Sequence, residues 1–250
     1  MPNSVEVIGN NAFEEAGALS ISIGPVFLGT EVFRNSKIKA LELKQIPEIP
    51  ASLCQGCSAL EDLKIPNTAR KLGKYAFSGC NSLQTVVMPV DIEFDKSTFE
   101  WTETREITYT PGETGIQPDR TQEGERCYYH SLEYQSVPTL KKITYSEGIT
   151  RIGDLAAGGW DVWEAHCGED KTLEEVVIPT TLTSIGNDAF LDCKNLISFE
   201  IPWKNGNLKN IGISAFEGCS SLPYMAVPSC TTIGQNCFAN HSQQFVLYGS

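Results

Sequence analysis

The sequence predicts a repeat solenoid, a right-handed parallel β solenoid that spans residues 1–250 as one domain, with a mostly irregular convex side. Two phrases that recur along the chain carry this prediction. One is a six-residue block, Ile-Gly-x-x-Ala-Phe, and the other is a run of the form Cys-x-x-Leu-x-x-Val-x-Ile-Pro. Most neighbouring blocks lie 20 to 26 residues apart. That spacing leaves no room for a full crossover helix between parallel strands, so we expect little helix.

The six-residue block supplies the expected core. Clear copies end at Phe13, Phe33, Phe77, Phe190, Phe216 and Phe238, and degenerate copies end at Cys54, Phe99 and Ala157. This slot holds seven of the eleven phenylalanines, so we expect their rings to stack from turn to turn in a continuous core. We also expect the glycine of each block to adopt positive φ in a tight turn.

The second phrase predicts the strands, because its aliphatic and β-branched residues alternate and its proline cannot continue a ladder. The expected strands are 38–43, 60–65, 83–88, 140–145, 173–178, 196–201 and 222–227. Side chains that alternate with the core residues form an outward strand face. On that face we expect Val87, Thr144 and Val177 to follow one another on successive rungs as a modestly apolar stripe.

Together the two phrases resemble the BspA-like class of leucine-rich repeats, whose repeat is IPxxVxxIGxxAFxxCxxLxxVxIP. The stretch from Ile178 to Pro202 keeps almost every position of that signature. The resemblance covers the chain except residues 100–137 and 158–172. It implies a curved leucine-rich-repeat solenoid, displayed on the cell surface of host-associated microbes or secreted, with an adhesive or interaction role. It implies no catalytic residue and no cofactor.

The charge of the chain bears on its partners. The formal net charge is −12 at pH 7, which repels phosphate backbones and anionic lipid. There is also no run of about 18 apolar residues and no apolar signal core at the N-terminus. We therefore expect no nucleic-acid partner and no membrane insertion.

The cysteines fit the repeat better than they fit a metal site. Cys57, Cys80, Cys193 and Cys219 share one slot, so we expect a ladder of buried, reduced thiols. Cys54-x-x-Cys57 has the spacing of half a zinc site or of a redox pair, but no second pair exists, so core packing is favoured over both. Whether any of Cys127, Cys167, Cys230 and Cys237 form a disulfide stays open.

No catalytic motif is present. The three histidines, His130, His166 and His241, lie in insertions or the tail, outside any metal-binding or nucleophile motif. We therefore predict no catalytic, metal or cofactor-binding residue and no enzyme, with an enzyme hidden in the insertions as a remote alternative.

Two departures from the period mark loop insertions, and insertions in solenoids often carry binding residues. The insertion at 100–137 contains Trp101, Tyr109, Tyr128, Tyr129 and Tyr134, among eight acidic residues and three arginines. Its run REITYT is expected in a hairpin or an open loop. The smaller insertion at 158–172 contains Trp160 and Trp163. Either these tryptophans form an exposed patch, or one of them fills the gap left by Ala157.

We therefore expect a protein-binding or adhesion module. The predicted contact residues are Tyr128, Tyr129, Tyr134, Tyr109, Trp101, Val87, Thr144 and Val177, with Trp160 and Trp163 beside them. The acidic insertion would select a host or microbial protein with a basic patch. A passive spacer in a larger surface protein is the alternative. Because the chain opens in the middle of a repeat, we also expect it to be part of a longer protein or to associate end to end.

Overall fold

The structure is a computed structural model that describes residues 5–17, 20–94, 96–118, 139–157, 172–202, 207–223, 225–228, 231–240 and 246–248. It divides into two compact units. The first comprises Met1–Thr108 and Tyr128–Leu140, and the second comprises Tyr109–Cys127 and Lys141–Ser250. Both are built of short parallel strands, and the only helix among the described residues is the 3-10 turn η1 (Lys96–Phe99). The predicted parallel β solenoid is confirmed.

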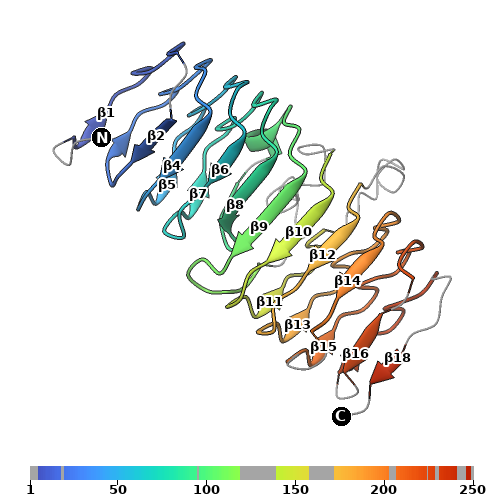
Figure 1. Cartoon of the computed structure of the whole chain (residues 1–250). Coiled ribbons are helices and arrows are strands. Elements are labelled where there is room, and N and C mark those ends of the chain that lie inside the picture. The colour runs from blue at the N-terminus through green and yellow to red at the C-terminus, as the bar shows by residue number, and fades with distance from the viewer. Residues whose placement is uncertain are drawn as a thin grey trace, which may run out of the picture. The chain divides into compact units, whose positions relative to one another are not determined.

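The first unit has one main row of strands (Figure 1). It consists of β2 (Ser20–Ile23), β4 (Ala40–Leu43), β6 (Asp62–Lys64) and β8 (Thr85–Pro89), each parallel to the next. A second row contains only two-residue strands, in which β1 (Val7–Ile8) pairs with β3 (Phe27–Leu28) and β5 (Glu48–Ile49) pairs with β7 (Lys71–Leu72). One core residue of each main strand meets its equivalent in the next turn, as Leu41 meets Leu63.

The second unit repeats this arrangement. Its main row contains β10 (Lys142–Tyr145), β12 (Glu175–Val177) and β14 (Ser198–Glu200). Its second row contains β11 (Arg151–Ile152), β13 (Ser184–Ile185), β15 (Asn210–Ile211) and β17 (Thr232–Ile233). The strands β16 (Ala226–Pro228) and β18 (Val246–Tyr248) form a further parallel pair.

All seven predicted strands overlap observed ones, whereas β2, β18 and the two-residue strands were not predicted, and one further unpredicted strand contradicts an expectation. β9 (Glu106–Thr110) lies inside the predicted insertion. In the first unit its Glu106 N–H donates to the carbonyl of Gln84 at 3.1 Å, and in the second unit its Tyr109 carbonyl accepts from the N–H of Ser146 at 3.0 Å.

The position of β9 corrects three expectations. The run REITYT contributes a parallel strand, not a hairpin or an open loop, and Ile116 after it bridges Arg151 in parallel. Residues 100–118 therefore follow the solenoid path, and only the later part of the predicted insertion 100–137 remains. Because β9 takes a rung between β8 and β10 in the chain, Val87 and Thr144 are not on successive rungs. The rest of that insertion and most of 158–172 lie outside the described residues.

The phenylalanine slot forms a stacked core column in each unit. The rings of Phe13 and Phe33 stack with centroids 5.3 Å apart, as do those of Phe77 and Phe99 at 5.6 Å. Cys54 interrupts this column, so the first unit lacks the continuous stack that we predicted. In the second unit Phe190, Phe216 and Phe238 stack without a break, at 5.3 and 5.7 Å.

The glycine of the six-residue block has a different role from the predicted one. A Cβ on Gly73 would lie 2.4 Å from the backbone nitrogen of Ala51, and one on Gly212 would lie 2.5 Å from that of Asn187. Neither glycine has positive φ. The slot needs glycine because the backbone of the preceding turn passes against it. Positive φ falls two residues later, at Asn11, Glu31, Tyr75, Leu155, Asp188, Ser214 and Asn236.

Candidate functional site

The outward strand face of the first unit carries a groove of about 490 Å³. It runs across β2, β4, β6 and β8. Along β4 and β6 the exposed residues alternate with buried ones, so the core residues fix which side chains point outward. The outward residues that line the groove are Ser20, Ser22, Ala40, Glu42, Asp62, Lys64, Thr85 and Val87. Serines on β2 and charged residues on β4 and β6 line it together with the apolar side chains of Ile21, Leu41 and Leu63.

Two carboxylates in this groove are oriented by neighbouring strands. The Ser22 hydroxyl donates to Glu42 Oε2 at 2.8 Å, and Lys44 Nζ lies 3.1 Å from the same oxygen. These two hydrogen bonds, that from Ser22 first, hold the pKa of Glu42 below its ordinary value. The Thr85 hydroxyl donates to Asp62 Oδ1 from the next strand. Both side chains are thus positioned in solvent and keep lone pairs for a ligand.

The same groove holds one cation and one apolar residue. Lys64 lies directly opposite Glu42 in the register, and Val87 lies opposite Lys64 on the other side. Val87 is half-buried, in keeping with its predicted place on the strand face. Charges of both signs, hydroxyl groups and an apolar end suit a polypeptide segment better than a small apolar molecule.

The strand face of the second unit is paired within itself. Lys142 and Glu175, opposite each other in the register, form an ion pair at 2.8 Å, and Lys141 and Glu174 form another at 2.5 Å. Thr144 and Val177 lie opposite each other on these strands and are half-buried, so this part of the predicted stripe is present.

The other predicted contact residues separate into three groups. Trp101 is 74% exposed. Tyr109 is only 4% exposed, and its ring stacks on that of Tyr145 at 5.3 Å. Its assignment as a contact residue is corrected, because β9 turns it into the core. Tyr128, Tyr129, Tyr134, Trp160 and Trp163 lie outside the described residues.

The cysteine slot is part of the core. Cys57 Sγ donates to the carbonyl of Phe33 at 2.8 Å, and Cys80 Sγ donates to that of Cys54 at 3.2 Å. Cys219 Sγ donates to the carbonyl of Phe190 at 3.1 Å, so the thiols also bind backbone of the preceding turn. Burial raises the pKa of Cys80 well above its usual range and that of Cys237 to about 12. Burial therefore makes the thiols of Cys80 and Cys237 poor nucleophiles, whereas hydrogen bonds with Cys54 and then Ser36 lower the pKa of Cys57. All of these side chains are buried, so the predicted packing role is confirmed.

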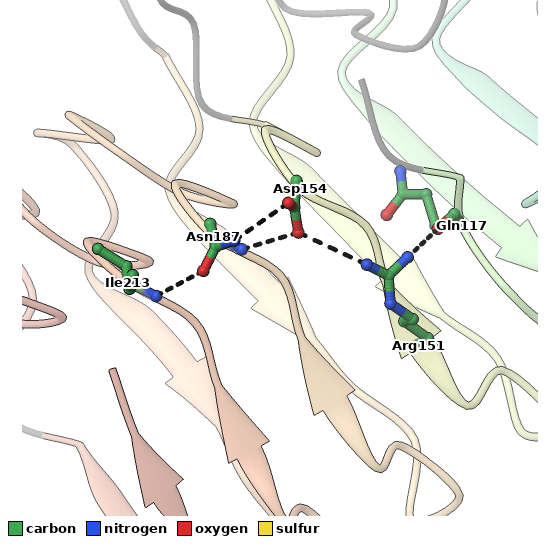
Figure 2. A network of polar contacts seen from close by, with 5 residues as sticks. All are labelled: Gln117, Arg151, Asp154, Asn187 and Ile213. Carbon is green, nitrogen blue, oxygen red and sulfur yellow. Dashed lines mark hydrogen bonds and ion pairs between the residues drawn. The ribbon is translucent and has the colours of Figure 1, made fainter. Parts of the chain in front are cut away.

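A polar ladder in the second unit was not predicted. Figure 2 shows Arg151 between Gln117 and Asp154, and Asn187 between Asp154 and Ile213. Asp154 Oδ1 accepts from the Asn187 N–H at 2.9 Å, and Asn187 Oδ1 accepts from the Ile213 N–H at 2.8 Å. In the first unit, Asn10 Oδ1 accepts from the Thr30 N–H at 3.0 Å in the same way. An Asn or Asp directly after the slot glycine is the sequence signal that could have revealed this ladder.

Two further features bear on function. Within the described ranges, no group of three or more His, Cys, Asp or Glu side chains is placed to hold a metal ion. The same residues include no helix with the length and apolar character to cross a membrane.

Fold and outward face together define a solenoid repeat protein whose turns are built on one template. The chain belongs to the family described as BspA type leucine-rich repeat region, which matches six copies over residues 1–117 and 164–247.

Several solved structures are similar to it. A leucine-rich repeat protein from Bacteroides ovatus matches at 20% identity and a TM-score of 0.46, over 99% of this chain and 76% of that one. One from Eubacterium ventriosum matches at 18% identity and a TM-score of 0.45, over 94% and 68%. A leucine-rich cell surface protein from Faecalibacterium prausnitzii matches at 16% identity and a TM-score of 0.30, over 82% and 65%. The comparison with curated proteins gave no match.

Proposed function

We propose that the chain is a non-enzymatic protein-binding or adhesion module of a microbial surface protein, and that the groove of the first unit is its contact surface. The observation that carries this proposal is the pair of exposed carboxylates, Glu42 and Asp62, each accepting a hydroxyl hydrogen bond from a neighbouring strand. Side chains that are already oriented lose less conformational entropy when a partner binds.

The partner that suits this surface is a basic segment of another protein. Both oriented groups are acidic, and the chain as a whole carries a formal charge of −12. That field speeds the approach of a cationic partner at low ionic strength. Lys64 supplies one positive group that fixes the direction of the bound segment, and Val87 supplies an apolar contact at the groove's end.

The three tyrosines Tyr128, Tyr129 and Tyr134 extend this proposal. They belong by sequence to the acidic stretch 100–136, and tyrosines on loops give large contact area at low entropy cost. Surface display, which the family supports, is part of the same proposal.

A passive spacer is the second candidate. It is favoured by the second unit, where lysines and glutamates on the strand face pair with each other. A spacer would use its outward residues only for its own stability, and it would bind no partner.

Selection of peptide ligands distinguishes the two. The whole chain, immobilised, is used to select binders from a phage-displayed library of random peptides. We expect enrichment of sequences rich in Lys and Arg. Their affinity should fall about tenfold for the double variant Glu42→Gln, Asp62→Asn.

The matched control neutralises two carboxylates on the strand face of the second unit, Glu175→Gln with Glu200→Gln, and should change affinity by less than about twofold. Failure to enrich any peptide would favour the spacer. An equal loss in both double variants would show that net charge, not the groove, governs binding.

A further inference from the structure

Among the residues that the structure describes, Trp101 is the most exposed large aromatic residue after Phe27. Its side chain is 74% exposed and its backbone has φ of 61°. It occupies the second left-handed position of the repeat, two residues after the phenylalanine slot. In the first unit this position holds Glu15, Asn35, Gly56 and Gly79, and in the second it holds Asp192, Gly218 and Asn240.

Nothing in the packing of the turn explains a tryptophan there. Glycine and asparagine adopt positive φ readily, whereas a bulky side chain does so only under strain. The indole recovers little of this cost through burial, since most of it stays in water. Strain that persists at an exposed side chain is a feature of functional positions.

The turn holds the backbone of Trp101 independently of its indole. With its amide nitrogen facing both carbonyls, Asn81 donates to the carbonyl of Trp101 at 2.7 Å and to that of Gly79 at 3.3 Å. The N–H of Gly79 donates to the carbonyl of Glu100 at 2.8 Å. A smaller residue at position 101 keeps all three bonds, so the indole can be removed without disturbing the turn.

The surroundings of the indole are acidic. Glu100 adjoins Trp101 and Glu103 follows two residues later, so their Cα atoms lie within about 4 and 8 Å of that of Trp101. Both distances fall within about one Debye length at physiological ionic strength. Residues 100–106 carry three carboxylates against the single guanidinium of Arg105. The face of an indole attracts cations, and nearby carboxylates strengthen that attraction.

We propose that Trp101 is an aromatic anchor for a Lys or Arg side chain of a basic protein segment, on the turn edge and separate from the strand-face groove. The proposal rests on the proposed function, because it names the partner's chemistry at a second contact. The cation stacks on the indole face while Glu100 and Glu103 supply the counter-charge.

The test follows the indole N–H resonance of Trp101 in the nitrogen-labelled full chain, identified by its loss in Trp101→Gly. The probe is the peptide acetyl-Gly-Lys-Gly-Arg-Gly-Lys-Gly-amide. Its control has acetyl-lysine and citrulline in place of Lys and Arg, which keeps side-chain size and removes charge. We expect a saturable shift with the basic peptide and affinity weaker by about fivefold or more with the neutral one. Glu100→Gln with Glu103→Gln should also weaken the basic peptide.

Stability measurements separate an anchor from a structural tryptophan. Trp101→Gly and Trp101→Asn place in this slot the residues that other turns use there, so both should melt no earlier than the unchanged chain. A drop of about 5 °C or more in both variants would assign the indole to the core and overturn the proposal. A shift that does not saturate, or equal affinity for the neutral peptide, would overturn it as well.

The groove variant Glu42→Gln, Asp62→Asn distinguishes failure of this inference from failure of the proposed function. It should leave the Trp101 titration unchanged. If Trp101 does not bind the basic peptide while selected peptides still lose affinity for the groove variant, the anchor is wrong and the groove remains.

Discussion

The two units build the same repeat but differ in their aromatic columns and in the side chains on their outward strand faces. In the second unit the phenylalanine column is unbroken, cross-strand ion pairs cover the strand face, and Asp154 and Asn187 tie three turns together. In the first unit Cys54 breaks the column, and the outward carboxylates of Glu42 and Asp62 line a groove. The comparison teaches that the repeat needs only its core slots, which leaves the outward positions of a unit available either for its own stability or for a partner.

The largest expected effect concerns the aromatic columns. Phe216 contacts three rings, those of Phe190, Phe199 and Phe238, whereas Phe77 stacks on Phe99 and has Cys54 on its other side. Phe216→Ala should lower the free energy of unfolding by about 4 kcal/mol and Phe77→Ala by about 3, as measured by urea unfolding. An equal or larger loss for Phe77→Ala would remove the distinction between the columns.

The polar ladder gives the next effect. Asn187 donates to Asp154 and accepts from Ile213, while Asn10 accepts only from Thr30. Asn187→Ala should lower the free energy of unfolding by about 1–2 kcal/mol, because two hydrogen bonds are lost. Asn10→Ala should lower it by about half as much, because only the hydrogen bond from the Thr30 N–H is lost. Thermal unfolding of both variants checks this order. If Asn10→Ala were the more costly, the ladder would not distinguish the second unit.

A smaller, pH-dependent effect on stability is expected at Asp188, which has positive φ and lies two residues after the slot glycine. Burial, then the charges of Asp154 and Glu217, raise the pKa of Asp188. The folded chain therefore keeps this proton at pH values where the unfolded chain has lost it. Stability contributed by the proton is present at low pH and is lost as pH rises through the raised pKa.

Asp188→Asn should accordingly melt later than the unchanged chain at pH 7, and the difference should vanish as pH falls below about 4. Its counterpart in the first unit, Glu31, pairs with Arg34 at 3.2 Å. Glu31→Gln should therefore melt no later than the unchanged chain at pH 7. A gain in both variants would point to general charge relief and not to the surroundings of Asp188.

The smallest effect concerns the strand faces. Glu42→Gln with Asp62→Asn should shift the melting temperature by less than about 1 °C, whereas Glu174→Gln with Glu175→Gln should lower it by about 1–2 °C. The difference arises because the second pair of changes removes two ion pairs between turns, those with Lys141 and Lys142, whereas the first removes one ion pair within a turn, between Glu42 and Lys44. Calorimetry of the two double variants measures it. Equal shifts would mean that the groove carboxylates also serve stability.

Most of the main strands could be predicted because Leu, Val and Ile alternate over enough residues to show a period of two. The second row could not, because strands such as Lys71–Leu72 contain only two residues and carry no period. The strand Glu106–Thr110 lacks the Leu and Pro of the phrase, yet Ile107 and Tyr109 alternate as Ile143 and Tyr145 do. That match was the available signal that Tyr109 is a core residue.

The candidate groove could be predicted only in part. The alternation along the predicted strands is enough to place Glu42, Asp62 and Lys64 on the outward face with Val87. It could not show that Ser22 and Thr85 orient the two carboxylates, because that depends on side-chain rotamers across neighbouring strands. The prediction that the slot glycine has positive φ was wrong, because a glycine in a tight turn and a glycine packed against another backbone look alike in sequence.

The close approach at that glycine has a consequence for how such chains change in evolution. Gly73, Gly186, Gly212 and Gly234 each pass against the backbone of the turn before them, and backbone is the same whatever side chains that turn carries. At this one contact the junction between turns therefore depends on backbone and hardly on the side chains of either turn. When recombination copies or removes one whole turn, the neighbouring glycines still meet backbone of the same shape. The number of turns can therefore change in evolution, while the outward residues are selected independently.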